Sequence, residues 1–308
     1  MSVAALTQEA PVRGTVFGYQ VRSHVPLAYL RHGGGEPLEV TEYAESGVRA
    51  DEPVLMSTTP TRAQPWHARL YGRGTGYRLW IAGGGWFEVD PDGRRIALPR
   101  VEDLVRREER LWGMPTLLCL IRRGDLTLHA AAVEVDGRAI VLAAPGNFGK
   151  TTLAAAFVRA GHRLLSEDVS CVRLGPETAV VPGPAMLRPR VDVARWLDVP
   201  SARVVGTGGG RVHLALAESE RGDCRPRPLR AVVLLLPAEG LGRLAPVPAA
   251  AAVRDLWALA FRLPGAADAG RCFPQLTALA GAVPVWHLPR PLRPDALQAT
   301  VERIAADA

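Results

Sequence analysis

The chain has 308 residues, enough for two domains, and its 48% hydrophobic and 22% charged residues are ordinary for a globular protein. It has no apolar run of about 18 residues, and its first residues lack the basic start and apolar core of a secretory signal, so we expect a cytoplasmic location and no membrane partner. The net charge of +6 is carried by scattered arginines, which argues against a nucleic-acid partner, and four cysteines without a C-x-x-C pair argue against a zinc site.

The first hundred residues predict a disordered tail over residues 1–13 and a β-rich domain over residues 14–100. Two apolar stretches, Tyr77–Ala82 and Trp86–Val89, flank three glycines and predict a hairpin. A turn at residues 90–93 and a further strand over Arg94–Leu98 follow. Residues 101–125 have helical periodicity, and Pro115 is expected to split or kink this connecting segment.

Residues 126–308 predict one α/β domain with a mixed sheet. Strands are expected at the ranges 126–135, 138–143, 163–165, 229–236 and 283–288, and helices at 150–160, 249–262 and 294–308. Asp136-Gly137 predicts a tight hairpin turn between the first two strands. In that register His129 faces Ala144, because opposite residues sum to 273.

A phosphate-loop pattern lies between the apolar strand that ends at Ala143 and the following helix. Its residues, the candidates for binding a nucleotide, are Ala144, Gly146, Asn147, Phe148, Gly149, Lys150, Thr151 and Thr152. The usual pattern is G-x-x-x-x-G-K-[ST], and only the first glycine is replaced, by Ala144. Unpaired N–H groups at a helix start bind phosphate oxygens, Lys150 neutralises phosphate charge, and the Thr151 hydroxyl is a Mg²⁺ ligand.

The basic residues of the chain support this interpretation. Of the 37 lysine and arginine residues only Lys150 is a lysine, and it occupies the position where the pattern requires a compact ammonium group. The alternative is a glycine-containing loop with an incidental lysine.

Two adjacent carboxylates, Glu167 and Asp168, end the strand that follows the helix. A strand–helix–strand crossover makes the two strands parallel, so both carboxylates are expected at the same sheet edge as the phosphate loop. One carboxylate can hold Mg²⁺ while the other accepts the proton of an attacking hydroxyl. The alternatives are a solvated acidic turn and, for His129, a hydrogen-bonded histidine at a strand end.

Together these pieces resemble the HPr serine kinase/phosphorylase family, and within it the short HPr-kinase-like branch. The resemblance rests on Leu128–Val133, on the loop from Ala144 to Thr152, and on the stretch Gly161–Asp168. It implies a core similar to phosphoenolpyruvate carboxykinase, and it implies ATP and Mg²⁺ as cofactors. Some members of this branch phosphorylate a serine of a lasso-peptide precursor.

The resemblance also implies roles for individual residues. Glu167 stands at the family's catalytic aspartate, where it would act as base with His129, and Asp168 stands at the second aspartate, where it would bind Mg²⁺ with Thr151. The base assignment between Glu167 and Asp168 stays open. Full-length relatives form rings, so a homo-oligomer is an open alternative.

Three functions remain open at this point. The first is a kinase for a serine- or threonine-type hydroxyl on a peptide or a small metabolite. The second is a nucleotide-dependent ATPase or switch, and the third is a degenerate nucleotide-binding partner in a biosynthetic complex. A weaker feature is the glycine-rich loop before Arg211, which is either a solvated surface loop or a flap that closes over substrate.

Overall fold

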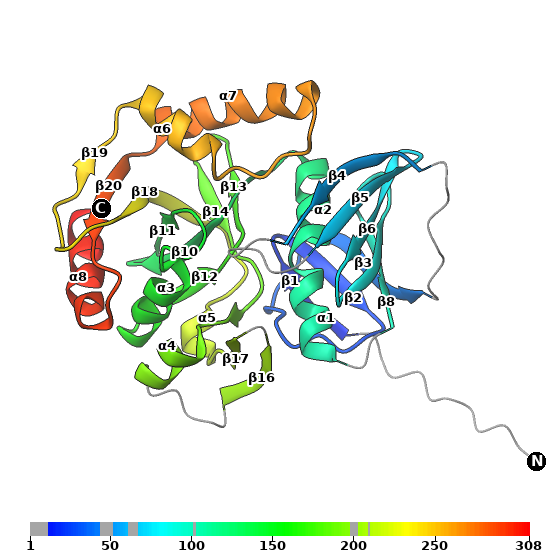
Figure 1. Ribbon diagram of the computed structural model, residues 1–308, viewed down its shortest axis with the longest axis horizontal. Coiled ribbons are helices and arrows are strands. Elements are labelled where there is room, and N and C mark those ends of the chain that lie inside the picture. The colour runs from blue at the N-terminus through cyan, green and yellow to red at the C-terminus, as the bar shows by residue number, and fades with distance from the viewer. Residues whose placement is uncertain (1–11, 44–51, 61–66, 101–102, 198–202, 209) are drawn as a thin grey trace, which may run out of the picture.

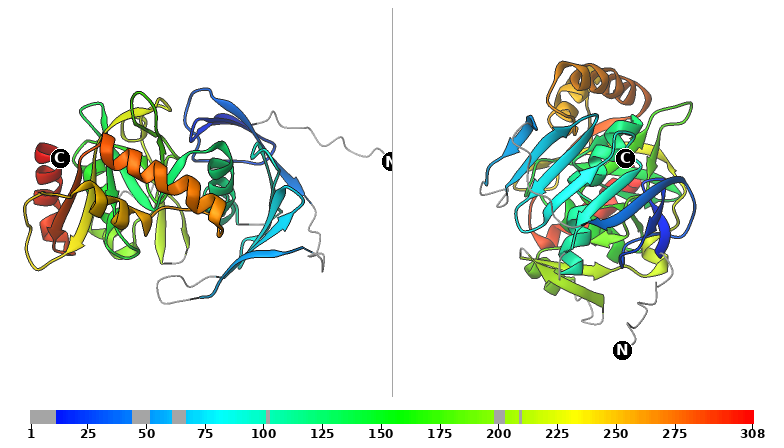
Figure 2. Two further views of the ribbon diagram at one scale, coloured as in Figure 1. Left: turned by 90° about the horizontal axis from the view of Figure 1, so that it is seen from above. Right: turned by 90° about the vertical axis from the view of Figure 1, so that its right-hand side faces the viewer.

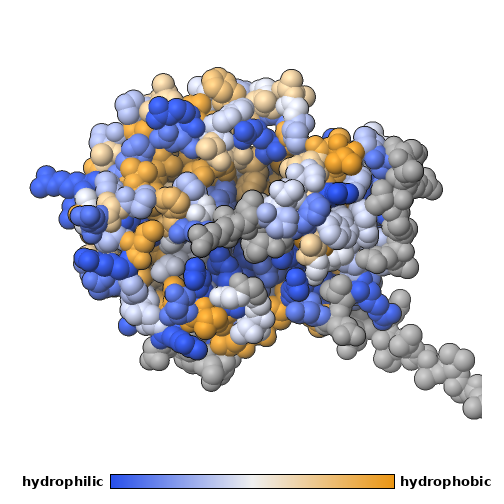
Figure 3. All heavy atoms as spheres, in the orientation of Figure 1, coloured by the Kyte–Doolittle hydropathy of each residue, from blue (hydrophilic) through white to orange (hydrophobic). Residues whose placement is uncertain are grey.

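The computed structural model describes residues 12–43, 52–60, 67–100, 103–197, 203–208 and 210–308. Two halves follow one another along the chain, with a pair of helices between them (Figure 1). Figure 2 shows the β-rich half beside the α/β half in its left view and in front of it in its right view. Hydrophilic and hydrophobic side chains are interspersed over the face drawn in Figure 3.

The first half is an eight-stranded sheet in the order β1-β2-β3-β8-β7-β6-β5-β4. Its strands are β1 (Val12–Val16), β2 (Tyr19–Ser23), β3 (Glu36–Tyr43), β4 (Val54–Thr58), β5 (Ala68–Arg73), β6 (Gly76–Ile81), β7 (Gly85–Val89) and β8 (Arg95–Pro99). Side chains alternate between core and solvent, as in β2, where Val21 is buried and Arg22 exposed. The hairpin expected around the three glycines is β6 and β7.

The connecting segment contains two helices, α1 (Leu104–Leu111) and α2 (Met114–Arg123). The side chain of Asp103 caps α1 by accepting a hydrogen bond from the Arg106 backbone N–H. Pro115 lies in the first turn of α2, where its missing N–H is tolerated. The expected split at Pro115 is therefore a break between two helices and not a kink within one.

The second half has a nine-stranded mixed sheet, ordered β12-β10-β11-β18-β14-β13-β9, with β20 paired to β18 and β19, and a three-stranded sheet ordered β15-β17-β16. Its strands are β9 (Leu126–Leu128), β10 (Ala130–Val135), β11 (Arg138–Ala143), β12 (Arg163–Ser166), β13 (Ser170–Arg173), β14 (Ala179–Val181), β15 (Met186–Leu187), β16 (Val204–Gly208), β17 (Arg211–Ala215), β18 (Arg227–Pro237), β19 (Ala245–Pro246) and β20 (Val285–Arg290). Its helices are α3 (Lys150–Arg159), α4 (Val191–Trp196), α5 (Glu218–Arg221), α6 (Ala249–Trp257), α7 (Ala266–Ala282), the short 3₁₀ helix η2 (Pro294–Ala296) and α8 (Leu297–Asp307).

Strand directions in this sheet gather several carboxyl ends at one edge. β11, β18 and β20 are mutually parallel neighbours, and β12 runs the same way because it is antiparallel to β10, which is antiparallel to β11. The loop after Ala143, the carboxylates after Ser166 and the end of β20 at Arg290 therefore share that edge.

The expected register between β10 and β11 is confirmed, with Ala130 opposite Ala143 and Val135 opposite Arg138. The single strand expected over residues 126–135 is instead two. The chain bends at His129, so that β9 pairs with β13 while β10 pairs with β11 and β12. Because of the bend, His129 belongs to neither β9 nor β10, and its side chain lies beside the phosphate loop.

The two halves share apolar core. Cys171, Val181 and Met186 of the second half belong to the same buried cluster as the inner face of the first sheet. Arg31 is 1% exposed and reaches across, donating from Nε to the Gly183 carbonyl and from Nη2 to the Leu164 carbonyl. The relative position of the halves is therefore fixed by packing and by buried hydrogen bonds.

The expected fold class, α/β with a mixed sheet preceded by a β-rich region, is confirmed. Three details differ from expectation. Residues 1–11 of the expected tail lie outside the described part of the chain, while Val12 and Arg13 belong to β1. The helix expected over 249–262 ends at Trp257, and α7 was not predicted. Among the described residues, no helix is both long and apolar enough to cross a membrane.

Candidate active site

The phosphate loop, residues 144–149, leads from β11 into α3. Asn147 and Gly149 have φ angles of 66° and 74°, in the left-handed region that asparagine and glycine adopt most readily. Ala144 is buried in the core and is not among the positive-φ residues, so the position does not need the usual glycine. Phe148 packs against the same core cluster. Packing beneath the loop therefore accommodates both Ala144, the departure from the pattern, and the large Phe148 side chain.

Lys150 is the first residue of α3, and its side chain folds back over the start of the loop. Its Nζ donates to the carbonyl oxygens of Ala144 at 2.8 Å and Pro145 at 3.1 Å, and it lies 3.0 Å from His129 Nε2. The Lys150 pKa is lowered to about 8, because burial lowers it most and Arg211 acts in the same direction, against the opposing charges of Asp168 and Glu167. An anion that binds in the loop would therefore stabilise the charged form of this ammonium group.

His129 connects Lys150 to the second carboxylate. Its Nδ1 lies 3.4 Å from Asp168 Oδ1, on the side of the ring opposite Lys150. Burial lowers the pKa of His129, and the Lys150 charge acts in the same direction, so the ring is neutral near pH 7. Because the Lys150 ammonium can only donate, Nε2 accepts and Nδ1 carries the proton that faces Asp168.

Asp168 is the more accessible of the two carboxylates, with half of its side chain exposed, against 3% for Glu167. Desolvation opposes its ionisation, but the charge of Arg188, the neighbouring His129 imidazole and the charge of Lys150 outweigh that effect and lower the pKa of Asp168. It is therefore an ionised carboxylate that an acceptor can reach.

Glu167 faces the other side of the loop. Its Oε1 accepts a hydrogen bond from the Thr151 hydroxyl at 2.9 Å. His129 thus contacts the second carboxylate and Thr151 contacts the first, the reverse of the pairing expected from the sequence. The physical reason is the turn after β12, which places successive side chains on opposite sides of the chain.

The largely buried guanidinium of Arg188 holds Glu167 in place. Arg188 donates from Nε to Glu167 Oε2 at 2.9 Å and from Nη1 to Glu109 Oε1 at 2.7 Å, and its Nη2 lies 3.7 Å from Asp168 Oδ2. Burial opposes its charge, but these three carboxylates raise the Arg188 pKa. Glu109 belongs to α1, so the connecting helix takes part in the site.

A second cation, Arg211, begins β17, the central strand of the three-stranded sheet. Its Nη1 donates to the Arg188 carbonyl oxygen at 2.8 Å and lies 3.9 Å from Glu167 Oε1. With 38% of the side chain exposed, it faces the open side of the loop. The glycine-rich hairpin expected to end in a cation therefore places that cation beside the site.

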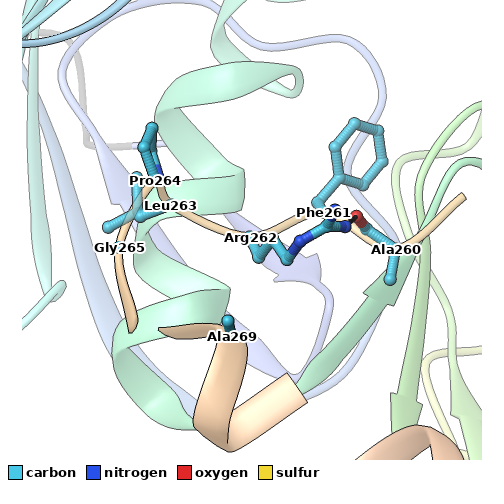
Figure 4. Close-up of a pocket in the computed structure, with 7 residues that line it drawn as sticks. All are labelled: Ala260, Phe261, Arg262, Leu263, Pro264, Gly265 and Ala269. Atoms are coloured by element: carbon cyan, nitrogen blue, oxygen red, sulfur yellow. Dashed lines mark hydrogen bonds between the residues drawn. The ribbon is translucent and has the colours of Figure 1, made fainter. Parts of the chain in front are cut away.

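An open cavity of about 390 Å³ lies next to His129. Its walls are the segment from Ala260 to Gly265 and Ala269, drawn in Figure 4. The ring of Phe261 in this wall meets the His129 ring edge-on, with 5.9 Å between centroids. The segment is anchored by the His129 N–H, which donates to the Leu259 carbonyl at 2.7 Å. Through Phe261 the cavity adjoins the His129 ring.

The loop and its surroundings suit a phosphate group and a hard cation. The N-cap of α3, Gly149, makes no side-chain capping bond, so the first N–H groups of the helix are available to phosphate oxygens. A hydroxyl and a carboxylate, Thr151 and Glu167, are the oxygen donors that Mg²⁺ takes together with phosphate and water. Among the described residues no group of three or more His, Cys, Asp and Glu side chains forms a metal cage.

Of the candidate residues, the structure brings Lys150, Thr151, His129, Glu167 and Asp168 into one connected set of contacts. Arg188, Glu109 and Arg290 also contact this set or the loop and were not anticipated. These three carry no motif, because each reaches the site through chain folding and not through spacing in the sequence.

The chain matches no protein-family model. It is 26% identical over 110 residues to the HPr kinase/phosphorylase of Nitrosomonas europaea, covering 35% of this chain and 34% of that protein. The chain thus spans about a third of the length of this curated relative. Among solved structures, the HPr(Ser) kinase/phosphatase from Coxiella burnetii aligns over 58% of this chain and 93% of its own, at 12% identity and a TM-score of 0.31, too low to equate the two folds.

Over these 110 residues the chain is similar to an HPr kinase/phosphorylase, the family that its phosphate loop, His129 and the Glu167–Asp168 pair resemble.

Proposed function

We propose that this protein is a kinase that binds ATP with Mg²⁺ and transfers the γ-phosphate to a hydroxyl group. One observation carries the proposal: Lys150 at the start of α3 contacts His129, His129 contacts Asp168, and Thr151 contacts Glu167. A cation, a hydroxyl and two carboxylates around uncapped helix N–H groups are the parts that phosphoryl transfer requires.

The contacts support a division of labour that differs from the one implied by family position. Asp168 is half exposed and paired with His129, so we assign it as the base. Glu167 is buried and bonded to Thr151, so we assign these two as the magnesium ligands. When bound, Mg²⁺ would neutralise charge on the phosphates.

In the proposed reaction, the acceptor hydroxyl gives its proton to a carboxylate oxygen of Asp168. The acceptor oxygen forms a bond to the γ-phosphorus while the bond from that phosphorus to the bridging oxygen breaks, and ADP leaves with the electron pair. His129 holds the Asp168 carboxylate in place through Nδ1, and Lys150 neutralises charge on the phosphate oxygens. The acceptor enters beside Phe261.

We further propose a serine-type hydroxyl on a peptide as the acceptor, and within that class a ribosomal precursor peptide of the lasso type. The name of the curated relative specifies HPr as its substrate. An open cavity beside the base supports an acceptor larger than water.

The test is transfer of labelled γ-phosphate from ATP, with Mg²⁺, to serine-containing peptides and to small hydroxylated metabolites. Lys150→Ala should lower transfer by at least roughly 10²-fold, because it removes the cation at the phosphates. Arg159→Ala, at the other end of α3, is the matched control and should keep activity. ADP release that ignores every acceptor would favour an ATPase or switch, and unchanged transfer by Lys150→Ala would refute the site.

A further inference from the structure

Arg290 is a buried cation next to the phosphate loop that neither the motif nor the catalytic set accounts for. It ends β20, at the same sheet edge as the loop, and it is 2% exposed. Its Nη2 donates to the carbonyl oxygens of Phe148 at 3.1 Å and Gly149 at 3.2 Å. A Cβ added to Gly149 would lie 2.5 Å from that nitrogen, so the guanidinium sits directly against the loop.

These two hydrogen bonds determine where the end of the loop points its donors. In a trans peptide the C=O and N–H groups point in opposite directions. When the Phe148 and Gly149 carbonyls face Arg290, the N–H groups of Gly149 and Lys150 face away from it, toward the inside of the loop. Lys150 holds the carbonyls at the start of the loop in a similar way. The loop is thus held at both ends by cations.

The positive charge of Arg290 is not paired with a carboxylate among the described side chains. Burial alone lowers the Arg290 pKa, to about 10, and no carboxylate of the described residues lies within ion-pair distance. Its Nε is buried and makes no hydrogen bond. A buried cation is costly when it is unpaired, and phosphates bound in the loop would supply the missing negative charge.

We propose that Arg290 is a positioning residue of the nucleotide site, which holds the Phe148 and Gly149 carbonyls and whose charge favours ligands with more phosphates. This role rests on the proposed function, because it presupposes a nucleotide in the loop. It also assigns a function to β20, which no motif marks.

The test compares the dissociation constants of ATP, ADP and AMP, each with Mg²⁺ at fixed ionic strength, for wild type, Arg290→Met and Arg290→Lys. Arg290→Met should weaken ATP binding by roughly tenfold or more, ADP binding less, and AMP binding least. Arg290→Lys, which keeps the charge, should retain the preference for ATP in part. The matched control is Arg230→Met, because Arg230 also donates to backbone carbonyls, those of Ala305 and Ala306, far from the loop.

The outcomes separate the two proposals. Wild-type protein that binds none of the three nucleotides would overturn the proposed function and this role with it. Wild-type protein that prefers ATP, with Arg290→Met showing the same three constants or an equal loss for all three, would overturn the role of Arg290 alone. If Arg290→Met does not fold, a folded Arg290→Lys decides: a partial loss of the preference for ATP supports the role, and unchanged constants or an equal loss for all three nucleotides overturn it.

Discussion

The two flanks of the phosphate loop are built differently. On one flank His129 and Asp168 are partly exposed and separated by 3.4 Å, and the ring of Phe261, which lines an open cavity, contacts His129. On the other, Glu167 and Arg188 are 3% and 11% exposed and belong to a network of ion pairs that continues through Glu109 in α1 to His213 in β17. A flank that must admit an acceptor needs access and a free carboxylate, whereas a flank that holds a metal ligand needs fixed charge.

The sharpest test of this comparison exchanges each carboxylate for its amide. Asp168→Asn should lower kcat by about 10² to 10⁴-fold while ATP still binds, because it removes a base. Glu167→Gln should instead raise the Mg²⁺ concentration required for half-maximal rate. The measurement is a steady-state rate as a function of Mg²⁺ for both variants.

The reverse pattern would restore the assignment implied by family position. In that case Asp168→Asn would change the Mg²⁺ requirement and Glu167→Gln would abolish transfer at every Mg²⁺ concentration.

Lys150, which lies between the flanks, predicts a pH dependence. Its pKa is lowered to about 8, and phosphate binding needs the protonated form. Affinity for ATP should therefore be highest at pH values below the Lys150 pKa. It should fall by up to about tenfold per pH unit as the pH rises through about 8. Equilibrium binding between pH 7 and about 9.5 tests this. An affinity that stays constant over this range would mean that Lys150 remains charged.

The smallest effect is expected from a change at Glu109 in α1, which contacts the site only through Arg188. Glu109→Gln removes one of three carboxylates around Arg188, so that guanidinium should act more strongly on Glu167 and Asp168 and make Asp168 a weaker base. We expect kcat to fall by roughly tenfold or less with ATP affinity unchanged, and the acidic limb of the pH–rate profile to move to lower pH.

The matched control for that change is Glu220→Gln. Glu220 is 20% exposed, against 19% for Glu109, and it pairs with Arg203 away from the loop. An equal loss of activity in both variants would indicate general destabilisation and would argue against a link from α1 to the base.

The sequence alone determined the parts of the site that depend on short-range geometry. A strand, a loop with Gly149 and Lys150, and a helix are contiguous, so their relation follows from spacing. The two-residue turn at Asp136-Gly137 fixes the β10–β11 register and thereby places the start of β10 at the end of β11, where the phosphate loop begins. The crossover from β11 to β12 brings the two carboxylates to the same edge for a similar reason.

The helix α7 and the pairing of the carboxylates with His129 could not be predicted from local sequence. The helix α7 contains Pro274 and two glycines, which obscure its periodicity, and tertiary packing of Leu276 and Leu279 stabilises it nonetheless. Which carboxylate faces His129 depends on the turn after β12, where adjacent side chains diverge, and adjacency in the sequence could not resolve it.

Sequence therefore specified the loop, its lysine and the approximate place of His129, Glu167 and Asp168, because neighbouring residues in regular elements have fixed relative positions. Only the tertiary structure decided that Glu109, Arg188 and Arg290 join them. These residues come from a connecting helix, a short strand region and the last strand of the sheet, and long-range packing, which no local pattern encodes, determines the distances between them.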